Sequence, residues 1–180
     1  MKNWATVVFI PTAAIITPVY AVDFMSETAA QKLLFTSADE FVSQSYPLND
    51  DMKDRIKDIA HVTPRYDEQR VSQVNEKGIH TGWFFVDNVI GKHEFITYAL
   101  AIDTAGKVLG VEILSYRETH GGQVRNPQWR INFVGKTVED RFKLNNDIPN
   151  ISGATLSCRN VTDGVKRLLA IHQLVLADHT

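Results

Sequence analysis

Hydrophobic and polar positions alternate with a period of two through the middle of the chain. This pattern predicts β-strands at Gln69–Asn75, Trp83–Ile90, Glu94–Ile102 and Val108–Ser115. The residues Asp103–Gly106, between the last two strands, are typical of a hairpin turn. Short strands joined by short links favour an antiparallel sheet. The lack of regular strand–helix alternation disfavours a doubly wound nucleotide-binding fold.

Apolar residues recur at helical spacing on both sides of these strands. Capping signals before the sheet predict three helical segments: a short helix from Ser26 through Phe35, a turn from Ser37 that carries Phe41 and Val42, and Asp50–Ala60. After the sheet, Asn126 and Pro127 suit the start of a short helix that bears Trp129 and Phe133. An apolar stripe from Val161 to Leu176 predicts a long closing helix. We therefore expect an α+β fold: an antiparallel sheet, a small N-terminal helical layer over residues 22–66, and a long C-terminal helix.

Two segments follow neither period. Residues 116–125 form a polar, glycine-containing loop, and Ile151–Ser157 directly precedes the long helix. Small residues and hydroxyls at a helix N-terminus leave backbone N–H groups and the positive end of the helix dipole free to hold an anion. Thr155 or Ser157 can equally serve as a helix cap, which is the more frequent role of such a run. The segment lacks the lysine of a P-loop and the glycine spacing of a dinucleotide site.

The first 21 residues have the organisation of a signal peptide. Lys2 supplies the positive start, Trp4–Ile16 is almost entirely apolar, and Ala21 is a small residue at the exit. The apolar run is about 15 residues, whereas a membrane-spanning helix needs about 20, and Pro11 and Pro18 interrupt the segment. We expect cleavage after residue 21 and export to a bacterial periplasm. A retained N-terminal membrane anchor is the less favoured alternative.

Composition and charge exclude several classes of protein. The 180 residues include 19 Lys and Arg against 21 Asp and Glu, a formal charge of −2. No basic block is present, so we predict no nucleic-acid partner. The single cysteine, Cys158, excludes a disulfide framework, and the six histidines lack metal-ligand spacing, so no bound metal is predicted. Cys158 falls in the first turn of the long helix, where the dipole would lower its pKa, although a buried structural thiol is the commoner role.

The segment Ser152–Ser157, followed by Val161 and the closing helix, resembles the signature of the FMN-binding domain family. Glu118–Gly122 is similar to the family's Glu-Thr-x-Gly loop, and Trp129 with Phe133 matches the aromatic pair after it. The resemblance covers roughly residues 80–176. The family includes the C subunit of sodium-translocating NADH:quinone oxidoreductase, the G subunit of Rnf complexes and small exported flavoproteins. It implies an FMN-binding domain over residues 67–180, with the N-terminal segment as part of the same unit.

The resemblance implies FMN attached through a phosphoester to Thr155 by an exported flavin transferase that uses FAD and magnesium. No catalytic side chain is then expected, because the flavin carries the chemistry. Trp129 could stack on the flavin ring or belong to the core, and Arg117, Arg125 and Arg159 are candidates to neutralise the phosphate. The other residues implied to bind the cofactor are Ser152, Gly153, Ala154, Leu156, Ser157, Glu118, Thr119, His120, Gly121 and Gly122.

One position departs from the family pattern. Family members usually carry an acid three residues before the motif serine, where this chain has Pro149, and Asp147 could replace that acid from a shifted backbone.

The expected function is that of an exported electron carrier. Its donor would be a membrane cytochrome or a quinol-linked protein, and its acceptor a periplasmic reductase or cytochrome. The sequence has no nicotinamide-binding pattern, which favours a carrier over a self-sufficient enzyme. The alternatives are a small FMN-dependent reductase acting on a soluble acceptor and a flavin-free binding or sensory module.

Overall fold

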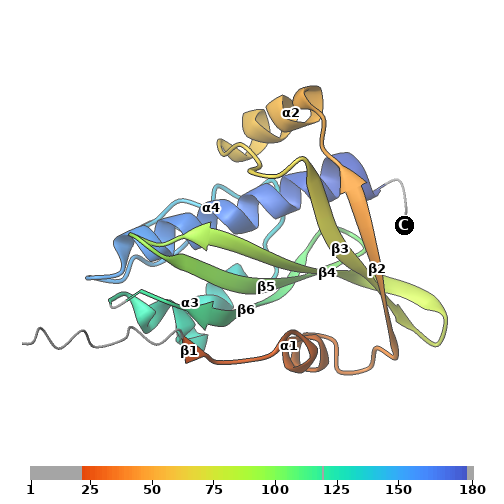
Figure 1. The fold of residues 1–180 in the computed structure, drawn as a ribbon, viewed down its shortest axis with the longest axis horizontal. Helices are drawn as coiled ribbons and strands as arrows, with labels where there is room; N and C mark the ends of the chain where they lie inside the picture. Colours follow the sequence, from red (N-terminus) through yellow and green to blue (C-terminus); the bar gives the residue numbers. More distant parts are fainter. Residues whose placement is uncertain (1–21, 119, 178–180) are drawn as a thin grey trace, which may run out of the picture.

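A computed structural model describes residues 22–118 and 120–177, and the predicted signal peptide lies outside these ranges. The four predicted strands are present as β3 (Glu68–Glu76), β4 (Ile79–Ile90), β5 (Phe95–Asp103) and β6 (Val108–Tyr116). They form the centre of a six-stranded antiparallel sheet with the order β1-β6-β5-β4-β3-β2 (Figure 1). The predicted turn after β5 is confirmed: the Asp103 carboxylate accepts hydrogen bonds from the N–H groups of Ala105 and Lys107, at 3.0 and 2.8 Å.

The two outer strands were not predicted. β1 (Val22–Asp23) pairs with the end of β6, and β2 (Glu40–Pro47) pairs with β3 along its whole length. The helical turn predicted from Ser37 is therefore wrong, because Phe41 and Val42 lie in β2. Phe41 packs edge-to-face against Phe84 of β4, with ring centroids 6.1 Å apart. A local capping signal was outweighed by strand pairing and by partial burial of this aromatic side chain.

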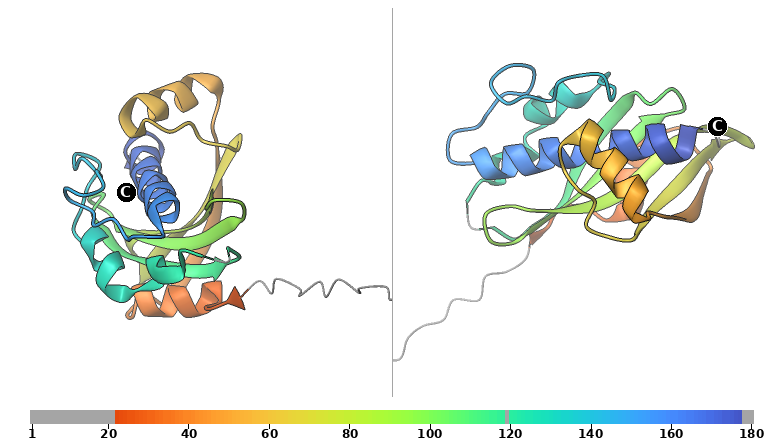
Figure 2. Two further views of the ribbon diagram at one scale, coloured as in Figure 1. Left: turned by 90° about the vertical axis from the view of Figure 1, so that its left-hand side faces the viewer. Right: turned by 90° about the horizontal axis from the view of Figure 1, so that it is seen from above.

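The two remaining N-terminal helices form as predicted and lie on opposite faces of the sheet (Figures 1 and 2). α1 (Glu27–Leu34) is capped by Ser26, and α2 (Asp50–Ala60) is capped by Asn49, whose side chain accepts from the N–H of Met52 at 2.8 Å. α1 covers a small apolar cluster that includes Phe84 and Leu114, whereas α2 lies beside the C-terminal helix.

The C-terminal helix α4 (Thr155–Ile171) continues into a π-helical turn, His172–Leu176, and crosses the sheet from one end to the other (Figure 1). The main core lies between this helix and the sheet, and its largest fully buried side chains include Trp83, Phe85, Tyr98 and Leu168. The observed architecture confirms the predicted α+β fold.

A buried polar group also joins α4 to the sheet. Arg167 of α4 forms an ion pair with Asp87 of β4, and Tyr98 of β5 donates to the same carboxylate at 2.6 Å. The Asp87 and Arg167 side chains are each 6% exposed. Burial and the Asp87 charge raise the pKa of Tyr98 well above its ordinary value. Tyr98 therefore stays a neutral donor to Asp87. Within the described residues, no helix combines the length and the hydropathy needed to cross a bilayer.

Candidate cofactor site

The N-terminus of α4 has no side-chain cap within the described part of the chain. Ala154 occupies the cap position, and the N–H of Cys158 makes the first helical bond to the carbonyl of Ala154, at 2.9 Å. The capping role considered for Thr155 or Ser157 is therefore wrong. The N–H groups of the first three helical residues lack acceptors within the helix and point out of its positive end. This end of the helix is built to accept an anionic group from outside the helix.

A tight turn brings the chain into this helix. Gly153 has φ +81°, a left-handed conformation that favours glycine, and the N–H of Ala154 closes the turn on the carbonyl of Ile151 at 3.0 Å. Ala154 is buried, whereas Ser152, Gly153, Thr155 and Leu156 are exposed. The Thr155 hydroxyl is thus carried on an exposed residue at the first helical position.

A cavity of about 610 Å³ opens beside this turn. Five of its lining residues come from the motif, and the others come from two loops that are distant in the sequence: Gly153, Ala154, Thr155, Leu156, Ser157, Glu118, His120, Lys92 and His93. The structure thus brings Glu118 and His120 to the motif and adds Lys92 and His93, which sequence analysis did not propose as site residues. Ser152, Gly121, Gly122 and Trp129 are not among the lining residues, and Thr119 lies outside the described residues.

Gly121 and Tyr116 fasten the loop after β6 to the motif. The Tyr116 hydroxyl donates to the carbonyl of His120 and lies 3.0 Å from the hydroxyl of Ser157. Gly121 has φ +89°, and a Cβ at this position would lie 2.5 Å from the Tyr116 hydroxyl. Burial raises the pKa of Tyr116, so its hydroxyl stays protonated. Gly121 therefore permits close packing of the loop against the motif.

Glu118 holds the opposite wall of the cavity. Its carboxylate accepts hydrogen bonds from the N–H groups of His93 and Glu94, the latter at 2.9 Å, in the turn between β4 and β5. Burial acts to raise the pKa of Glu118, but these backbone donors outweigh it and lower the pKa. A Cβ on Gly91 would lie 2.7 Å from the carboxylate oxygen, so this glycine makes room for Glu118. Glu118 thus positions Lys92 and His93 at the cavity.

Trp129 belongs to the core and forms a hydrogen bond to the segment that precedes the motif. It lies in α3 (Pro127–Arg130), is 4% exposed, and packs edge-to-face on Phe133 with ring centroids 5.0 Å apart. Its indole N–H donates to the carbonyl of Pro149 at 2.7 Å. Of the two roles considered for Trp129, the structure thus places it in the core.

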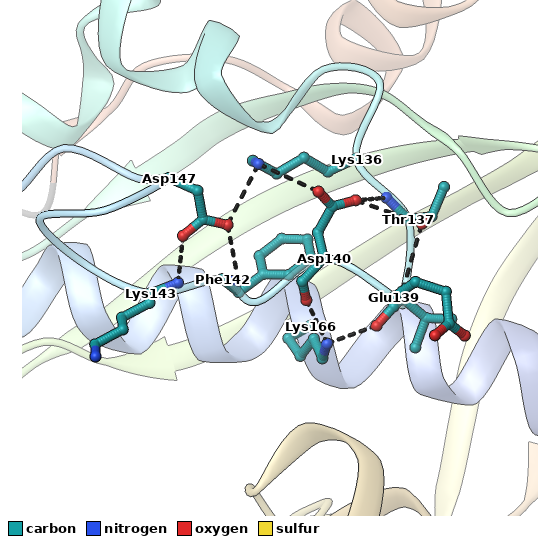
Figure 3. Close-up of polar contacts among 9 residues, drawn as sticks. Lys136, Thr137, Glu139, Asp140, Phe142, Lys143, Asp147 and Lys166 are labelled. Atoms are coloured by element: carbon teal, nitrogen blue, oxygen red, sulfur yellow. Dashed lines mark hydrogen bonds and ion pairs between the residues drawn. The ribbon is translucent and has the colours of Figure 1, made fainter.

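The Asp147 side chain binds groups within the loop that precedes the motif (Figure 3). Its carboxylate accepts from the N–H groups of Phe142 and Lys143, at 3.0 and 2.6 Å, and pairs with Lys136 at 3.3 Å. Burial acts to raise the pKa of Asp147, but the hydrogen bonds and the Lys136 charge lower it. Lys166 of α4 donates to the carbonyl of Asp140 in the same loop, at 2.6 Å. Asp147 therefore organises this loop and does not line the cavity, so the shifted-backbone role considered for it is not supported.

The remaining candidates lie outside the cavity. Cys158 is fully buried and its pKa is raised by burial, so the predicted lowering by the helix dipole is wrong. Arg125 places its guanidinium 3.9 Å from the centre of the Phe24 ring, while Arg117 and Arg159 are exposed. Among the described residues, no three His, Cys, Asp or Glu side chains gather where they could hold a metal ion.

The comparison with protein families finds one family whose model matches part of the chain. Residues 91–170 match the model of the FMN-binding domain, a stretch that runs from Gly91 through Glu118 and the motif into α4. This match confirms the family resemblance predicted from the motif, over residues 91–170. A crystal structure of NqrC from Shewanella oneidensis is similar at 19% identity with a TM-score of 0.48, over 79% of this chain and 70% of that chain. No curated protein matches the chain.

Proposed function

We propose that this protein is an exported electron carrier whose FMN is attached through a phosphoester to Thr155. The observation that carries the proposal is the uncapped N-terminus of α4, which presents an exposed threonine to a cavity within the matched FMN-binding segment. Of the two hydroxyl residues that line the cavity, Thr155 is exposed, whereas Ser157 is buried and bonded to Tyr116. Thr155 is therefore the proposed attachment residue.

The groups around the cavity suit a flavin phosphate. The free N–H groups at the start of α4 supply donors and a partial positive charge, and Lys92 adds a full positive charge across the cavity. His93 and His120 add two ring systems that can donate hydrogen bonds. The cavity volume lies within the range of ordinary small-molecule sites, about 300–1,000 Å³. These residues would hold the phosphate and the flavin at the surface of the protein.

Attachment is proposed to use FAD and magnesium and to be carried out by a flavin transferase. The Thr155 hydroxyl oxygen attacks the FMN-side phosphorus of FAD, the pyrophosphate bond breaks, AMP leaves, and the hydroxyl proton passes to solvent. The protein gains the mass of FMN less one water. An ester retains the cofactor in an exported protein, from which a dissociable flavin would be lost by dilution.

Bound FMN would supply one- and two-electron redox chemistry. The chain's own residues then bind and orient it, and none is proposed as a proton donor or nucleophile in turnover. Glu118 keeps the turn that carries Lys92 in place, and Tyr116 keeps the loop that carries His120 against the motif. The positive charges nearby would favour a negatively charged, reduced cofactor over a neutral one.

The proposed partners follow from the lack of a nicotinamide-binding pattern in the sequence. Electrons would come from a membrane cytochrome or quinol-linked donor and pass to a periplasmic reductase or cytochrome. Faster oxidation of the reduced protein by generic soluble dyes than by a cytochrome would favour the alternative, a small reductase.

Mass spectrometry of the intact exported protein tests the attachment. Protein produced with a flavin transferase should be heavier by FMN less one water and should fluoresce in a denaturing gel. Thr155→Ala should remove both signals, because the ester oxygen is lost. Ser152→Ala is the matched control, since it removes an exposed motif hydroxyl that does not line the cavity, and it should keep both signals.

An unmodified wild-type protein would contradict covalent attachment. A Thr155→Ala variant that kept the extra mass would place the ester elsewhere, with Ser157 as the next candidate. Thr155 is exposed and caps nothing in α4, so its replacement should change the free energy of unfolding by only about 0.5 kcal/mol or less. A lost signal in a folded variant therefore reports on attachment.

A further inference from the structure

β2 forms one edge of the sheet, and among the strands only β3 pairs with it (Figure 1). Leu48, directly after β2, donates its N–H to the carbonyl of Asp67 at 2.8 Å. Because backbone groups alternate in direction along a strand, the even-numbered residues of β2 bond to β3, and the N–H and C=O groups of Phe41, Ser43 and Ser45 point outward. No described group bonds to these outward groups, which we call the outer edge of β2.

The opposite edge of the sheet is bonded to other parts of the chain. Val108 of β6 accepts a hydrogen bond from the N–H of Gly135 at 2.8 Å and donates to the carbonyl of Lys136 at 2.9 Å. Leu114 of the same strand accepts from the N–H of Phe24 at 2.8 Å. The fold thus pairs outward backbone groups at β6, whereas those at β2 have no partner among the described residues.

β2 lacks the features that protect a sheet edge from pairing. Such edges usually carry a lysine, a proline within the strand or a bulge. The residues Phe41–Tyr46 carry no charge, and the register with β3 runs without a break. Glu40 and Pro47 lie only at the two ends of the strand. The outer edge is therefore suited to pairing with a further strand.

The sheet face beside this edge is also open. A cavity of about 590 Å³ lies on the α1 side of the sheet, where Ser43 and Ser45 line it together with Phe84 and Val86 of β4. α1 packs mainly on β5 and β6, and both serines are exposed. On this face, a second strand can approach the outer edge of β2 without displacing a described element.

We propose that two copies of the protein pair through the outer edge of β2, antiparallel and about a two-fold axis at Ser43. Ser43 then lies opposite Ser43 of the second copy, and Phe41 lies opposite Ser45, so every outward N–H of the three residues meets an outward C=O. A shift in one direction would place Phe41 opposite Pro47, which has no N–H. A shift in the other would place Ser45 opposite Asp39, outside the strand.

The charges and the neighbours of β2 are compatible with this pairing. Glu40, the one charged residue of the strand, lies opposite the uncharged Tyr46 of the second copy, so no like charges meet. A two-fold contact in which both copies use the same surface is the commonest form of dimer. No residue of β2 lines the cofactor cavity, so the pairing leaves the cavity accessible and does not depend on the flavin assignment.

Oligomeric state tests the interface. The wild-type protein should sediment as a dimer in analytical ultracentrifugation. Ser43→Lys places two like charges face to face at the two-fold axis and should raise the dimer dissociation constant at least about tenfold. Ser37→Lys is the matched control, because it adds the same charge at an exposed serine in the turn before β2 and should leave the dissociation constant unchanged.

A wild-type protein that stayed monomeric up to about 1 mM would overturn the proposal. A dimer that Ser43→Lys left intact, in a variant with unchanged circular dichroism, would place the interface elsewhere and would also overturn it.

Cysteine cross-linking tests the register. Ser43→Cys should be joined to a second copy by a short bismaleimide, because the two residues lie directly opposite one another. Ser37→Cys lies beyond the paired strands and should not be joined, and Cys158 is fully buried and does not compete. Equal cross-linking of the two variants would contradict the proposed pairing.

Amide hydrogen exchange, measured by NMR, distinguishes the two sides of β2. The amides of Phe41 and Ser45 should exchange at least about tenfold faster in Ser43→Lys than in wild type. The amides of Val42 and Gln44, which bond to β3, should exchange alike in both proteins. If the outward amides were protected in a monomeric protein, another segment of the chain would cover the edge and the proposal would be wrong.

Discussion

Gly121 lies where the loop after β6, the core tyrosine Tyr116 and the motif serine Ser157 meet. Its left-handed φ is one that side chains other than glycine rarely adopt, and its hydrogen faces two hydroxyl groups. The resemblance implied that this glycine binds the cofactor. In the structure, it permits close approach of the protein's own side chains.

Gly121→Ala is expected to loosen the site. The new methyl group would meet the Tyr116 hydroxyl at 2.5 Å and the Ser157 hydroxyl at 3.0 Å, in a strained backbone conformation. We expect a loss of about 1–3 kcal/mol in the free energy of unfolding and incomplete flavin attachment. Urea denaturation and intact mass measure the two effects.

Gly122→Ala is the matched control, because the nearest atom to its added methyl group would lie 3.7 Å away. Its unfolding free energy should stay within about 0.5 kcal/mol of wild type. If the two alanine variants were equally stable and equally loaded, the close contact at Gly121 would not matter.

Individual residues also show which parts of the site could be predicted from the sequence. The Ile151–Ser157 motif is contiguous, so its place before a helix could be predicted from the sequence alone. Lys92 and His93 reach the cavity only because β4 and β5 end beside α4 and Glu118 binds the turn between them. The residue types in Gly91–Phe95 do not indicate that this turn lies beside α4 and the cavity. The direction of the Cys158 pKa shift likewise depends on burial, which raises the pKa and outweighs the backbone hydrogen bonds that act to lower it.

At the scale of elements, strands with a clear alternation and helices with a clear stripe were predicted to within a few residues. β2 was missed because its burial alternates imperfectly and its partner β3 lies about 30 residues further along. Which face each helix covers was also beyond the sequence, since both N-terminal helices are amphipathic. The loop over residues 136–151 shows no period, and its shape depends on half-buried charged side chains such as Asp147 and Lys166.

Trp129→Phe tests how α3 supports the motif. The variant keeps an aromatic ring against Phe133 but removes the hydrogen bond to the Pro149 carbonyl. We expect a loss of about 1–3 kcal/mol in the free energy of unfolding and slower flavin attachment, because the segment leading to Gly153 is held less firmly. Time courses of intact mass with purified transferase measure the attachment rate.

Phe133→Leu is the control, because it perturbs the same core and leaves the indole bond in place. Similar attachment rates in the two variants would mean that core packing, and not the Pro149 bond, sets the geometry of the motif.

At the scale of the whole molecule, α4 runs from the cavity at its N-terminus to a buried histidine at its C-terminal end. Its first turn presents free N–H groups at the cofactor cavity, and its last turn passes into the π-helical segment that begins with His172. His172 is 4% exposed, and no described residue bonds to its Nε2. Burial lowers the pKa of His172; His80 also lowers it and the Asp103 charge opposes the shift.

Stability should therefore fall in mild acid. The unfolded chain binds a proton on His172 near pH 6.5, while the folded protein resists it, so the unfolded state gains protons first as the pH drops. The free energy of unfolding should be level above about pH 6.5 and decline below it, with a slope of up to about 1.4 kcal/mol per pH unit from this group. Urea titrations between pH 5 and 7.5 give the profile.

His172→Leu should flatten this decline, because it removes the buried titrating group and keeps an apolar side chain. Comparing the two proteins cancels the contributions of the acids, including Asp163, whose pKa is raised by burial. A variant whose profile paralleled that of wild type would assign the acid sensitivity to other groups.

β1 fixes where the N-terminal end of the described chain leaves the molecule. Val22 pairs with Tyr116, two residues before Glu118, so residue 22 lies one strand away from the loop that borders the cofactor cavity. If the predicted leader stayed attached as an anchor, it would tether the cavity within a short reach of the bilayer and limit it to partners in the same membrane. Removal of the predicted leader would let the same cavity travel between the proposed membrane donor and distant acceptors. Proteolytic processing would then decide whether the protein works as a fixed relay or as a shuttle.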